Sequence, residues 1–106
     1  MFGNFRRANT DRSGRSFSEA TVNAVWNKGQ VVPGYDPNVW RKDACGAWIN
    51  RSEYGQTTRN GWEVDHFMPV TRGGGDELAN LQPLYWENNR HKGDSWPQWS
   101  CAVRAA

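Results

Sequence analysis

EVDHFMPVTRGGGDELANLQPLYWENNRHKGD, residues 63–94, is the stretch of this 106-residue chain that decides the fold. Apolar and polar residues alternate up to the Asp65-His66 pair, and this alternation predicts a strand that ends at the pair. Three glycines follow in a loop, where they permit positive φ angles and close approach of the backbone. Residues 81–84 predict a second strand, and a short helix that Gly93 ends comes next. The predicted order is strand, glycine-rich loop, strand, helix.

The rest of the chain predicts one small α+β domain with an aromatic core. Ser18 is a good N-cap for a helix over residues 19–28, whose apolar residues share one face. Seven tryptophans supply apolar area that other proteins of this size take from leucine. We expect Trp40, Trp48 and Ile49 to enter this core from two short extended segments on either side of a turn.

The N-terminal residues are basic. Residues 1–30 contain five Lys or Arg and two Asp or Glu. Gly, Ser, Asn and Thr separate the first arginines, so residues 1–16 are predicted to form a flexible basic arm, and residues 17–106 the single folded domain. Such an arm either stays solvated without a partner or contacts nucleic-acid phosphates, for which Arg6 and Arg7 are the candidates.

The cysteines and the apolar runs bear on location. Cys45 and Cys101 are the only two cysteines. Neither belongs to a CxxC motif, so a zinc knuckle is not supported, and the spacing leaves open whether the two pair with each other. No signal peptide is recognisable and no apolar run is long enough for a membrane span, so the expected location is the cytoplasm.

Three polar signals follow one another in the decisive stretch: Asp65-His66, Asn80 and Asn89. In a strand–loop–strand–helix unit the end of the first strand lies against the start of the helix, so the Asp-His pair and Asn89 can face one another. Carboxylate and amide oxygens are hard ligands that suit Mg²⁺, and a neutral histidine can take a proton from water. With a substrate phosphate, this set predicts phosphodiester hydrolysis. Alone, His66 would more often be a hydrogen-bonded structural residue.

Residues 41–94 resemble the HNH nucleases, which have a small ββα-metal (His-Me finger) fold. The resemblance lies in DH with a proline three residues after the His, the glycine loop, NLQPL and NxxKGD, in that order, within a motif core at residues 62–94. It implies a DNA endonuclease that uses one Mg²⁺ or Mn²⁺ ion and leaves 5′-phosphate and 3′-hydroxyl ends. Many members bind a structural zinc through two CxxC pairs. Here Tyr85 and Asn88 stand where the second pair would fall, so no structural zinc is expected, and tryptophans would hold the fold instead.

The resemblance also implies a role for each polar residue. His66 would be the general base. Asn80 would hold the loop by hydrogen bonds from its side chain to the backbone and would orient His66. Asp65 and Asn89 would be the protein ligands of the metal ion, in an H-N-N version of the motif. The candidates for phosphate contacts in this half of the chain are Arg72, Arg90 and Lys92.

His91 is the alternative to Asn89 as the last ligand. Two residues apart on a helix means about 200° of rotation, so the two side chains cannot both reach one ion. Asn89 shares a face with Lys92, three residues on, and the family pattern places the ligand three residues before this lysine. We therefore expect Asn89 to be the ligand and His91 to face solvent or contact DNA.

Two classes of function compete. The leading hypothesis is an endonuclease that cleaves DNA, with double-stranded DNA as the expected substrate. The alternative is a module that binds nucleic acid or another protein without cutting. The joint presence of Asp65, His66 and Asn89 favours cleavage. A third hypothesis is a secreted or injected toxin nuclease with an inhibitor protein. Few residues look suited to read bases, so a weak sequence preference is expected.

Overall fold

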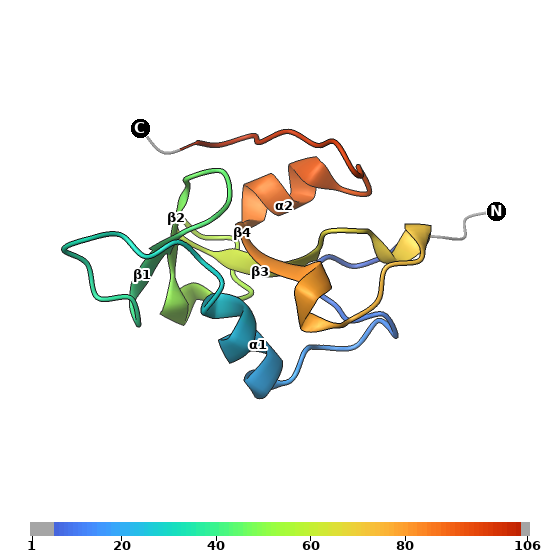
Figure 1. Cartoon of the computed structure of the whole chain (residues 1–106), viewed down its shortest axis with the longest axis horizontal. Helices are drawn as coiled ribbons and strands as arrows, with labels where there is room; N and C mark the ends of the chain where they lie inside the picture. The colour runs from blue at the N-terminus through green and yellow to red at the C-terminus, as the bar shows by residue number, and fades with distance from the viewer. Residues whose placement is uncertain (1–5, 105–106) are drawn as a thin grey trace.

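The computed structural model describes residues 6–104 and shows two short helices packed on two small antiparallel sheets (Figure 1). One sheet pairs β1 with β2, and the other pairs β3 with β4. The α+β class and the order of strand, loop, strand and helix are therefore as predicted. In chain order the elements are α1 (Glu19–Trp26), β1 (Trp40–Lys42), β2 (Trp48–Asn50), β3 (Trp62–His66), β4 (Leu81–Tyr85) and α2 (Trp86–Lys92).

The β3–β4 hairpin is the centre of the domain. Its strands pair over their full length, from Trp62 opposite Tyr85 to His66 opposite Leu81. Every residue of both strands is buried, so the polar residues of β3 must find partners inside the protein. Helix α2 starts directly after β4, contacts both strands, and ends at Gly93 with a φ of 52°. The end of β3 and the helix are thereby placed side by side.

The core lies between α1, β2 and the hairpin and combines aromatic with aliphatic side chains. Ser18 caps α1 as predicted, because its side chain accepts a hydrogen bond from the Thr21 N–H. The rings of Trp26 and Trp62 have centroids 5.2 Å apart, and those of Tyr54 and Trp62 are 4.9 Å apart. Aliphatic side chains fill the remaining space, namely Val22, Val25, Ala47, Ile49, Val64 and Leu81.

The prediction that Trp40 and Trp48 enter this core is wrong. Ile49 is fully buried, but both tryptophans are only half-buried and pack on each other with centroids 6.0 Å apart. Successive residues of a strand point to opposite faces of the sheet. Because Ile49 faces the core, its neighbour Trp48 faces away, together with Trp40 on the paired strand.

The glycine-rich loop uses its glycines in the two ways predicted. Gly73 ends the short 3₁₀ helix η2 (Val70–Arg72) with a φ of 95°, which favours glycine. A Cβ atom on Gly74 would lie 1.7 Å from the carbonyl oxygen of Met68, so no other residue fits there. The loop then passes through η3 (Leu78–Asn80) into β4.

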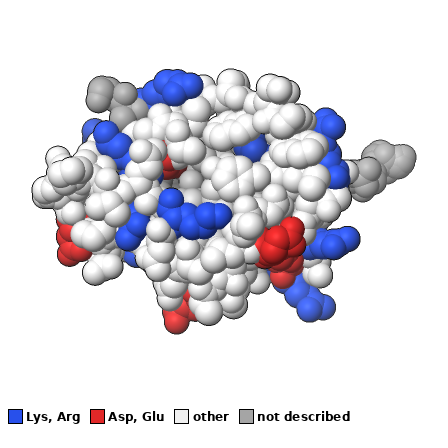
Figure 2. Space-filling model, in the orientation of Figure 1, with Lys and Arg blue, Asp and Glu red and all other residues white. Residues whose placement is uncertain are grey.

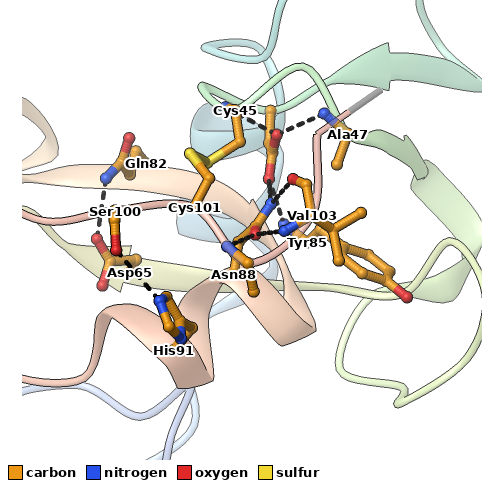
Figure 3. The surroundings of a disulfide bond; sticks show 12 residues. Cys45, Ala47, Asp65, Gln82, Tyr85, Asn88, His91, Ser100, Cys101 and Val103 are labelled. Atoms are coloured by element: carbon orange, nitrogen blue, oxygen red, sulfur yellow. Dashed lines mark hydrogen bonds between the residues drawn. A yellow bond between two sulfur atoms is a disulfide. The ribbon is translucent and has the colours of Figure 1, made fainter. Parts of the chain in front are cut away.

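A buried carboxylate, that of Asp43, joins the β1–β2 turn to the start of α2. Figure 3 shows its partners Cys45, Ala47, Tyr85 and Asn88. Asp43 is completely buried and accepts hydrogen bonds of 2.9 and 2.8 Å from the N–H groups of Cys45 and Ala47. Its other oxygen accepts from the Tyr85 N–H at 2.9 Å and from the Asn88 amide at 3.0 Å. Tyr85 and Asn88 occupy the positions at which a second cysteine pair would fall. A hydrogen-bonded carboxylate joins these segments, in addition to the tryptophans expected to hold them.

The segment after α2 is fastened to the same place. Cys45 and Cys101 form a disulfide, so the pairing that the sequence left open is present. Asn88 adds three hydrogen bonds, two accepted from the N–H groups of Ala102 and Val103 and one donated to the Val103 carbonyl. The C-terminal segment therefore runs back across α2 to the β1–β2 turn (Figure 1).

Two observations concern the cellular location. Disulfides persist in oxidising environments and are rare in the cytosol, so the expectation of a cytoplasmic protein does not account for the Cys45–Cys101 bond. Between residues 6 and 104, none of the helices has the length and apolar character needed to cross a membrane.

The described part of the predicted arm, residues 6–16, is called here the N-terminal segment. Residues 1–5 lie outside the described part of the chain. The segment contains no helix or strand but lies against β3, where the Asn9 side chain accepts a hydrogen bond of 2.8 Å from the Val64 N–H. Asn9 has a φ of 61°, a conformation that asparagine tolerates better than most residues. These contacts place the segment beside the polar end of β3.

Candidate active site

A cavity of about 230 Å³ opens between the N-terminal segment, the end of β3 and the end of α2. Three residues selected from the sequence line it together: Asp65, His66 and Asn89. The end of β3 faces α2, but at the end of the helix and not at its start as predicted. The antiparallel register places Tyr85, directly before α2, opposite Trp62 at the start of β3. The other lining residues are Arg6, Arg7, Ala8, Asn9, Thr10, Val64, Pro69, Val70, Arg90, Gly93 and Asp94.

Asp65 is buried and held from two sides. Its Oδ2 atom accepts a hydrogen bond of 3.0 Å from Gln82, across the hairpin, and its Oδ1 atom lies 3.3 Å from the Nζ atom of Lys92. Burial raises the pKa of the Asp65 carboxyl, while the Gln82 hydrogen bond and the Lys92 charge act in the opposite direction. A carboxylate in this position gains from binding a cation, because burial alone disfavours its charge.

His66 makes a close polar contact that the sequence did not predict. Its Nε2 atom lies 2.8 Å from the Oδ1 atom of Asp76, which belongs to the loop after the glycines. The ring of Phe17 lies near the imidazole, with centroids 5.8 Å apart. The backbone of His66 is also fixed, because the Lys92 ammonium donates 2.9 Å to its carbonyl oxygen. His66 is therefore held at its backbone carbonyl and at one ring nitrogen, with the Phe17 ring beside the imidazole.

Asn80 has the hydrogen bonds expected of a loop-holding residue. Its Oδ1 atom accepts from the Met68 N–H at 2.8 Å, and its Nδ2 atom donates to the carbonyls of Met68 at 3.1 Å and Gly75 at 2.9 Å. One side chain thereby closes the loop between β3 and the turn that leads to β4. Its side chain contacts the loop backbone and not the His66 ring, so any effect on His66 would pass through the loop.

Asn89 is oriented by Glu63, a residue that was not selected from the sequence. The Nδ2 atom of Asn89 donates 2.8 Å to Oε1 of Glu63, which is 2% exposed. Among the residues at positions 6–104, no donor contacts the Oδ1 atom of Asn89, and this residue lines the cavity. The signal for Glu63 was its place in β3: two residues before Asp65, it faces the same side of the strand.

Three neighbouring polar residues of α2 face three ways. Asn88 is completely buried and bonds to Asp43 and the C-terminal segment. Asn89 lines the cavity. His91 is exposed, and its Nε2 atom lies 3.1 Å from the hydroxyl of Ser100. His91 thus lies on the outer side of the helix, as expected when Asn89 was preferred to it.

Lys92 corrects a prediction. It was a candidate for phosphate contacts, but it is 1% exposed and its ammonium donates to the carbonyls of His66 and Phe67 and lies beside Asp65. A buried ammonium needs such partners to offset its loss of hydration. Lys92 therefore supports the end of β3 and is not available to a nucleic acid.

The other basic candidates lie at or near the cavity rim. Arg6, Arg7 and Arg90 line the cavity and also a neighbouring one of about 510 Å³. Arg90 is half-exposed although it forms an ion pair of 2.7 Å with Glu63. Arg72 is exposed and donates 3.1 Å to the Asp94 carbonyl. Elsewhere the charges are mixed: on the face in Figure 2, Lys and Arg side chains lie in several separate places with Asp and Glu between them.

The oxygen atoms of the cavity fit a hard divalent cation. Asp65 offers a carboxylate. Asn89 offers its amide oxygen, because its Nδ2 atom is the one that bonds to Glu63. Within the described residues no group of three or more His, Cys, Asp or Glu side chains could hold a metal ion. A pair of one carboxylate and one amide is a smaller set, which suits an ion that keeps several waters and binds substrate phosphate, as Mg²⁺ does.

Comparison with known proteins gives one match. Residues 45–95 match the family model of the HNH endonuclease. The match starts at the β1–β2 turn, ends just after α2, and includes Asp65, His66, Asn80 and Asn89. No curated protein and no solved structure matches the chain.

Proposed function

We propose that this protein, which carries an HNH endonuclease domain at residues 45–95, is a metal-dependent endonuclease that hydrolyses phosphodiester bonds of DNA. The observation that carries the proposal is the single cavity shared by Asp65, His66 and Asn89. It combines a histidine base with two oxygen ligands under a rim of arginines, which are the groups that phosphodiester hydrolysis needs.

His66 is assigned the role of general base. A neutral imidazole takes a proton from water, the water oxygen forms a bond to phosphorus, and the bond from phosphorus to the 3′ oxygen breaks. The 3′ oxygen leaves with the electron pair of that bond and takes a proton from solvent, and His66 returns its proton to solvent, so the products carry a 5′-phosphate and a 3′-hydroxyl. Lys92 supports this role, because its ammonium holds the backbone of His66 next to the Asp65 carboxylate. A positioned base contributes about 10²–10⁴-fold to a rate.

Asp65 and Asn89 would hold the divalent ion. Mg²⁺ is the expected ion, and Mn²⁺ would replace it. When bound, such an ion supplies positive charge to the phosphate oxygens and the leaving oxygen. Gln82 and Lys92 hold the Asp65 carboxylate, and Glu63 holds the Asn89 amide, so both ligands are oriented by second residues.

The nucleic acid would be bound by its phosphates. Arg6, Arg7 and Arg90 border the cavity, and Arg72 lies beside Asp94 at its edge. Contacts of this kind position a strand without reading its sequence, so double-stranded DNA of any sequence is the expected substrate. Asn80 is assigned the role of holding the loop that carries Met68 and Gly75 next to the site.

A plasmid nicking assay tests the proposed function. Wild-type protein should nick supercoiled DNA with Mg²⁺ or Mn²⁺ and stop when EDTA is added. His66→Ala should lose at least about 100-fold in rate while keeping its affinity for DNA, because only the base is removed. His91→Ala, which changes the other histidine on the outer side of α2, is the matched control and should cleave like the wild type.

The assay also separates the alternatives. Equal nicking by His66→Ala and wild type would exclude His66 as the base. A wild type that shifts DNA in a gel with EDTA present, and that does not cut the DNA whichever metal ion is added, would be a binding module and not a nuclease. Labelled duplex DNA, single-stranded DNA and RNA of one sequence, compared in the same assay, identify the substrate.

A further inference from the structure

We propose that Asp76 is a positioning residue that decides which ring nitrogen of His66 carries the proton. In this arrangement the Nε2–H group donates to Asp76, and Nδ1 keeps the lone pair that receives a proton from water. The inference rests on the proposed function, since it concerns the base of that reaction. The carboxylate of Asp76 is held by the fold in a way that makes this role specific.

The contact itself is short and sheltered on one side. Nε2 of His66 lies 2.8 Å from Oδ1 of Asp76, and the two side chains are 10% and 40% exposed. A neutral imidazole has one donor and one acceptor nitrogen, and a carboxylate can only accept. The nitrogen beside Asp76 must therefore be the donor when the ring is neutral, so the acceptor is the other nitrogen.

The N-terminal segment fixes the Asp76 carboxylate. The Arg12 N–H donates to both of its oxygens, at 3.0 and 3.1 Å. A backbone N–H carries its proton at every relevant pH. It therefore holds the Asp76 carboxylate in place whether or not the His66 ring contacts it. The segment is held against β3 by the hydrogen bond of 2.8 Å from the Val64 N–H to the Asn9 side chain. Within the segment the Arg6 guanidinium donates 2.6 Å to the Asp11 carbonyl, next to Arg12. A part of the chain expected to be a flexible arm thus supports the base.

The loop fixes the backbone of Asp76. The preceding residue, Gly75, accepts 2.9 Å from the Asn80 amide, and the Asn80 N–H donates 2.8 Å to the Glu77 carbonyl. Asp76 therefore lies between two restrained residues. This arrangement connects Asn80 to His66 through Asp76, which gives a physical route for the orienting effect that was expected of Asn80.

Other charged groups surround His66 without offering the same contact. Asp65 precedes it in the strand and is engaged with Gln82 and Lys92. Lys92 donates to the His66 carbonyl and not to its ring. Arg6, Arg7 and Arg90 line the same cavity, but the ring contact is made by Asp76. Asp76 is the residue whose substitution should change the ring proton.

The test is the nitrogen NMR spectrum of the imidazole rings in the metal-free protein. The chain has two histidines, so His91→Ala assigns the His66 signals. At a pH where the ring is neutral, wild-type His66 should carry its proton on Nε2. Asp76→Asn offers an amide that can donate as well as accept, so a mixture of both ring forms should appear. Glu77→Gln makes the same chemical change one residue later and should leave the spectrum unchanged.

Kinetics give the second measurement. Asp76→Asn should lower kcat about 10- to 100-fold and leave KM for DNA within about twofold, as expected for a residue that acts through another. Asp76→Glu keeps a carboxylate and should restore part of the kcat. Glu77→Gln should match the wild type, which excludes the loss of one negative charge near DNA as the cause.

The outcomes are distinguishable. A wild-type ring protonated on Nδ1, or an unchanged ring in Asp76→Asn, would overturn the role of Asp76 even if the enzyme cleaves DNA. A kcat that falls equally in Asp76→Asn and Asp76→Glu, with no change in the ring form, would show that Asp76 only supports the loop, and would also overturn it. If the wild type does not cleave, the proposed function fails, while the spectrum still decides whether Asp76 sets the ring proton.

Discussion

The Nδ2 atom of Asn89 donates a hydrogen bond of 2.8 Å to the Oε1 atom of Glu63, and both residues are buried. The carboxylate can only accept, so it fixes which end of the amide points to it. The Oδ1 atom of Asn89 is then left for the cavity. Glu63 thus determines whether Asn89 presents an oxygen or an N–H group to a metal ion.

Glu63→Gln should therefore weaken metal binding without removing a ligand. A glutamine can donate as well as accept, so the Asn89 amide is no longer held in one orientation. We expect the affinity for Mn²⁺ to fall about 10- to 100-fold, the usual effect of changing a residue that orients a ligand. Isothermal titration of the purified protein measures it.

Arg90→Gln is the control for that variant, because Arg90 is the other partner of Glu63, at 3.1 and 2.7 Å. It breaks the ion pair and leaves the contact between Glu63 and Asn89. Its affinity for Mn²⁺ should stay within about threefold of the wild type, while its affinity for DNA falls. Equal losses of metal affinity in the two variants would show that the ion pair between Glu63 and Arg90, and not the orientation of the Asn89 amide, determines the affinity for Mn²⁺.

Three substitutions along α2 should have three different effects. Asn88→Ala leaves the buried Asp43 carboxylate without one donor and the N–H groups of Ala102 and Val103 without an acceptor, so it should lower the free energy of unfolding by about 2–3 kcal/mol. Asn89→Ala should lose cleavage and metal affinity at least about tenfold. His91→Ala should change neither. Urea unfolding, metal titration and nicking on the same three proteins measure this. Loss of metal affinity in His91→Ala alone would reverse the assignment of the last ligand.

The local unit was predictable and its long-range partners were not. The order of strand, glycine loop, strand and helix was predicted from residues 63–94, and in the structure this unit brings Asp65, His66 and Asn89 to one cavity. Glu63 and Asp76 are different, because a carboxylate in a sequence gives no sign of its partner. Their roles depend on the path of the chain, which places Asp76 ten residues from His66 and yet within 2.8 Å of it.

Two errors have a common physical origin. Lys92 was expected at the surface because it is charged, and Trp48 in the core because it is aromatic. Asp65 and two carbonyls make the burial of Lys92 acceptable, and strand alternation turns Trp48 outward once Ile49 faces the core. In both cases the neighbours of the residue, and not its own polarity, decided its place.

Reduction of the disulfide should destabilise the protein. The bond joins residues that are 56 positions apart, and in the chain-entropy account closing such a loop contributes about 4 kcal/mol. Reductant should therefore lower the midpoint of urea unfolding of the wild type. The double variant Cys45→Ser with Cys101→Ser should start at the lower midpoint and not respond to reductant. A wild type that unfolds identically with and without reductant would contradict the presence of the bond in solution.

Metal binding should weaken in acid. Burial raises the pKa of the Asp65 carboxyl above its ordinary value of 3.8, against the opposing effects of Gln82 and Lys92. Below the raised pKa the carboxyl holds a proton, so affinity for a cation falls as the pH drops through a window that begins above 3.8.

In the metal-free protein the ionisation of Asp65 opposes folding. The folded state holds this proton more tightly than the unfolded state, so the Asp65 charge costs stability as the pH rises through the same window.

Titration calorimetry with Mn²⁺ at about pH 5 and about pH 8, each in two buffers of different protonation enthalpy, measures the released proton. Release should be larger at the acidic pH. Asp65→Asn should bind the ion weakly and release no proton from this position. Proton release that is the same at both pH values would show that the carboxyl is fully ionised throughout.

Arg7 should contribute to DNA affinity through charge alone. Arg7 is exposed and lines both cavities. From there its guanidinium would contact a DNA phosphate, and a phosphate contact does not read the base edges. Arg7→Gln should weaken binding to all sequences alike and reduce the slope of log affinity against log salt by about one. Lys42→Gln is the matched control, because its ammonium lies 4.8 Å from the centre of the Trp48 ring, on the β1–β2 sheet.

Arg6→Gln should differ from Arg7→Gln in a way that identifies the N-terminal segment as part of the site. Arg6 bonds to the carbonyls of Asp11 and Arg12, and the Arg12 N–H donates to Asp76. Its loss should therefore reduce kcat about tenfold as well as the salt slope, whereas Arg7→Gln reduces the slope and leaves kcat at saturating DNA unchanged. Filter binding at several salt concentrations and nicking at saturating DNA separate the two effects. If both variants change only the slope, the segment contributes charge to the site but does not position His66.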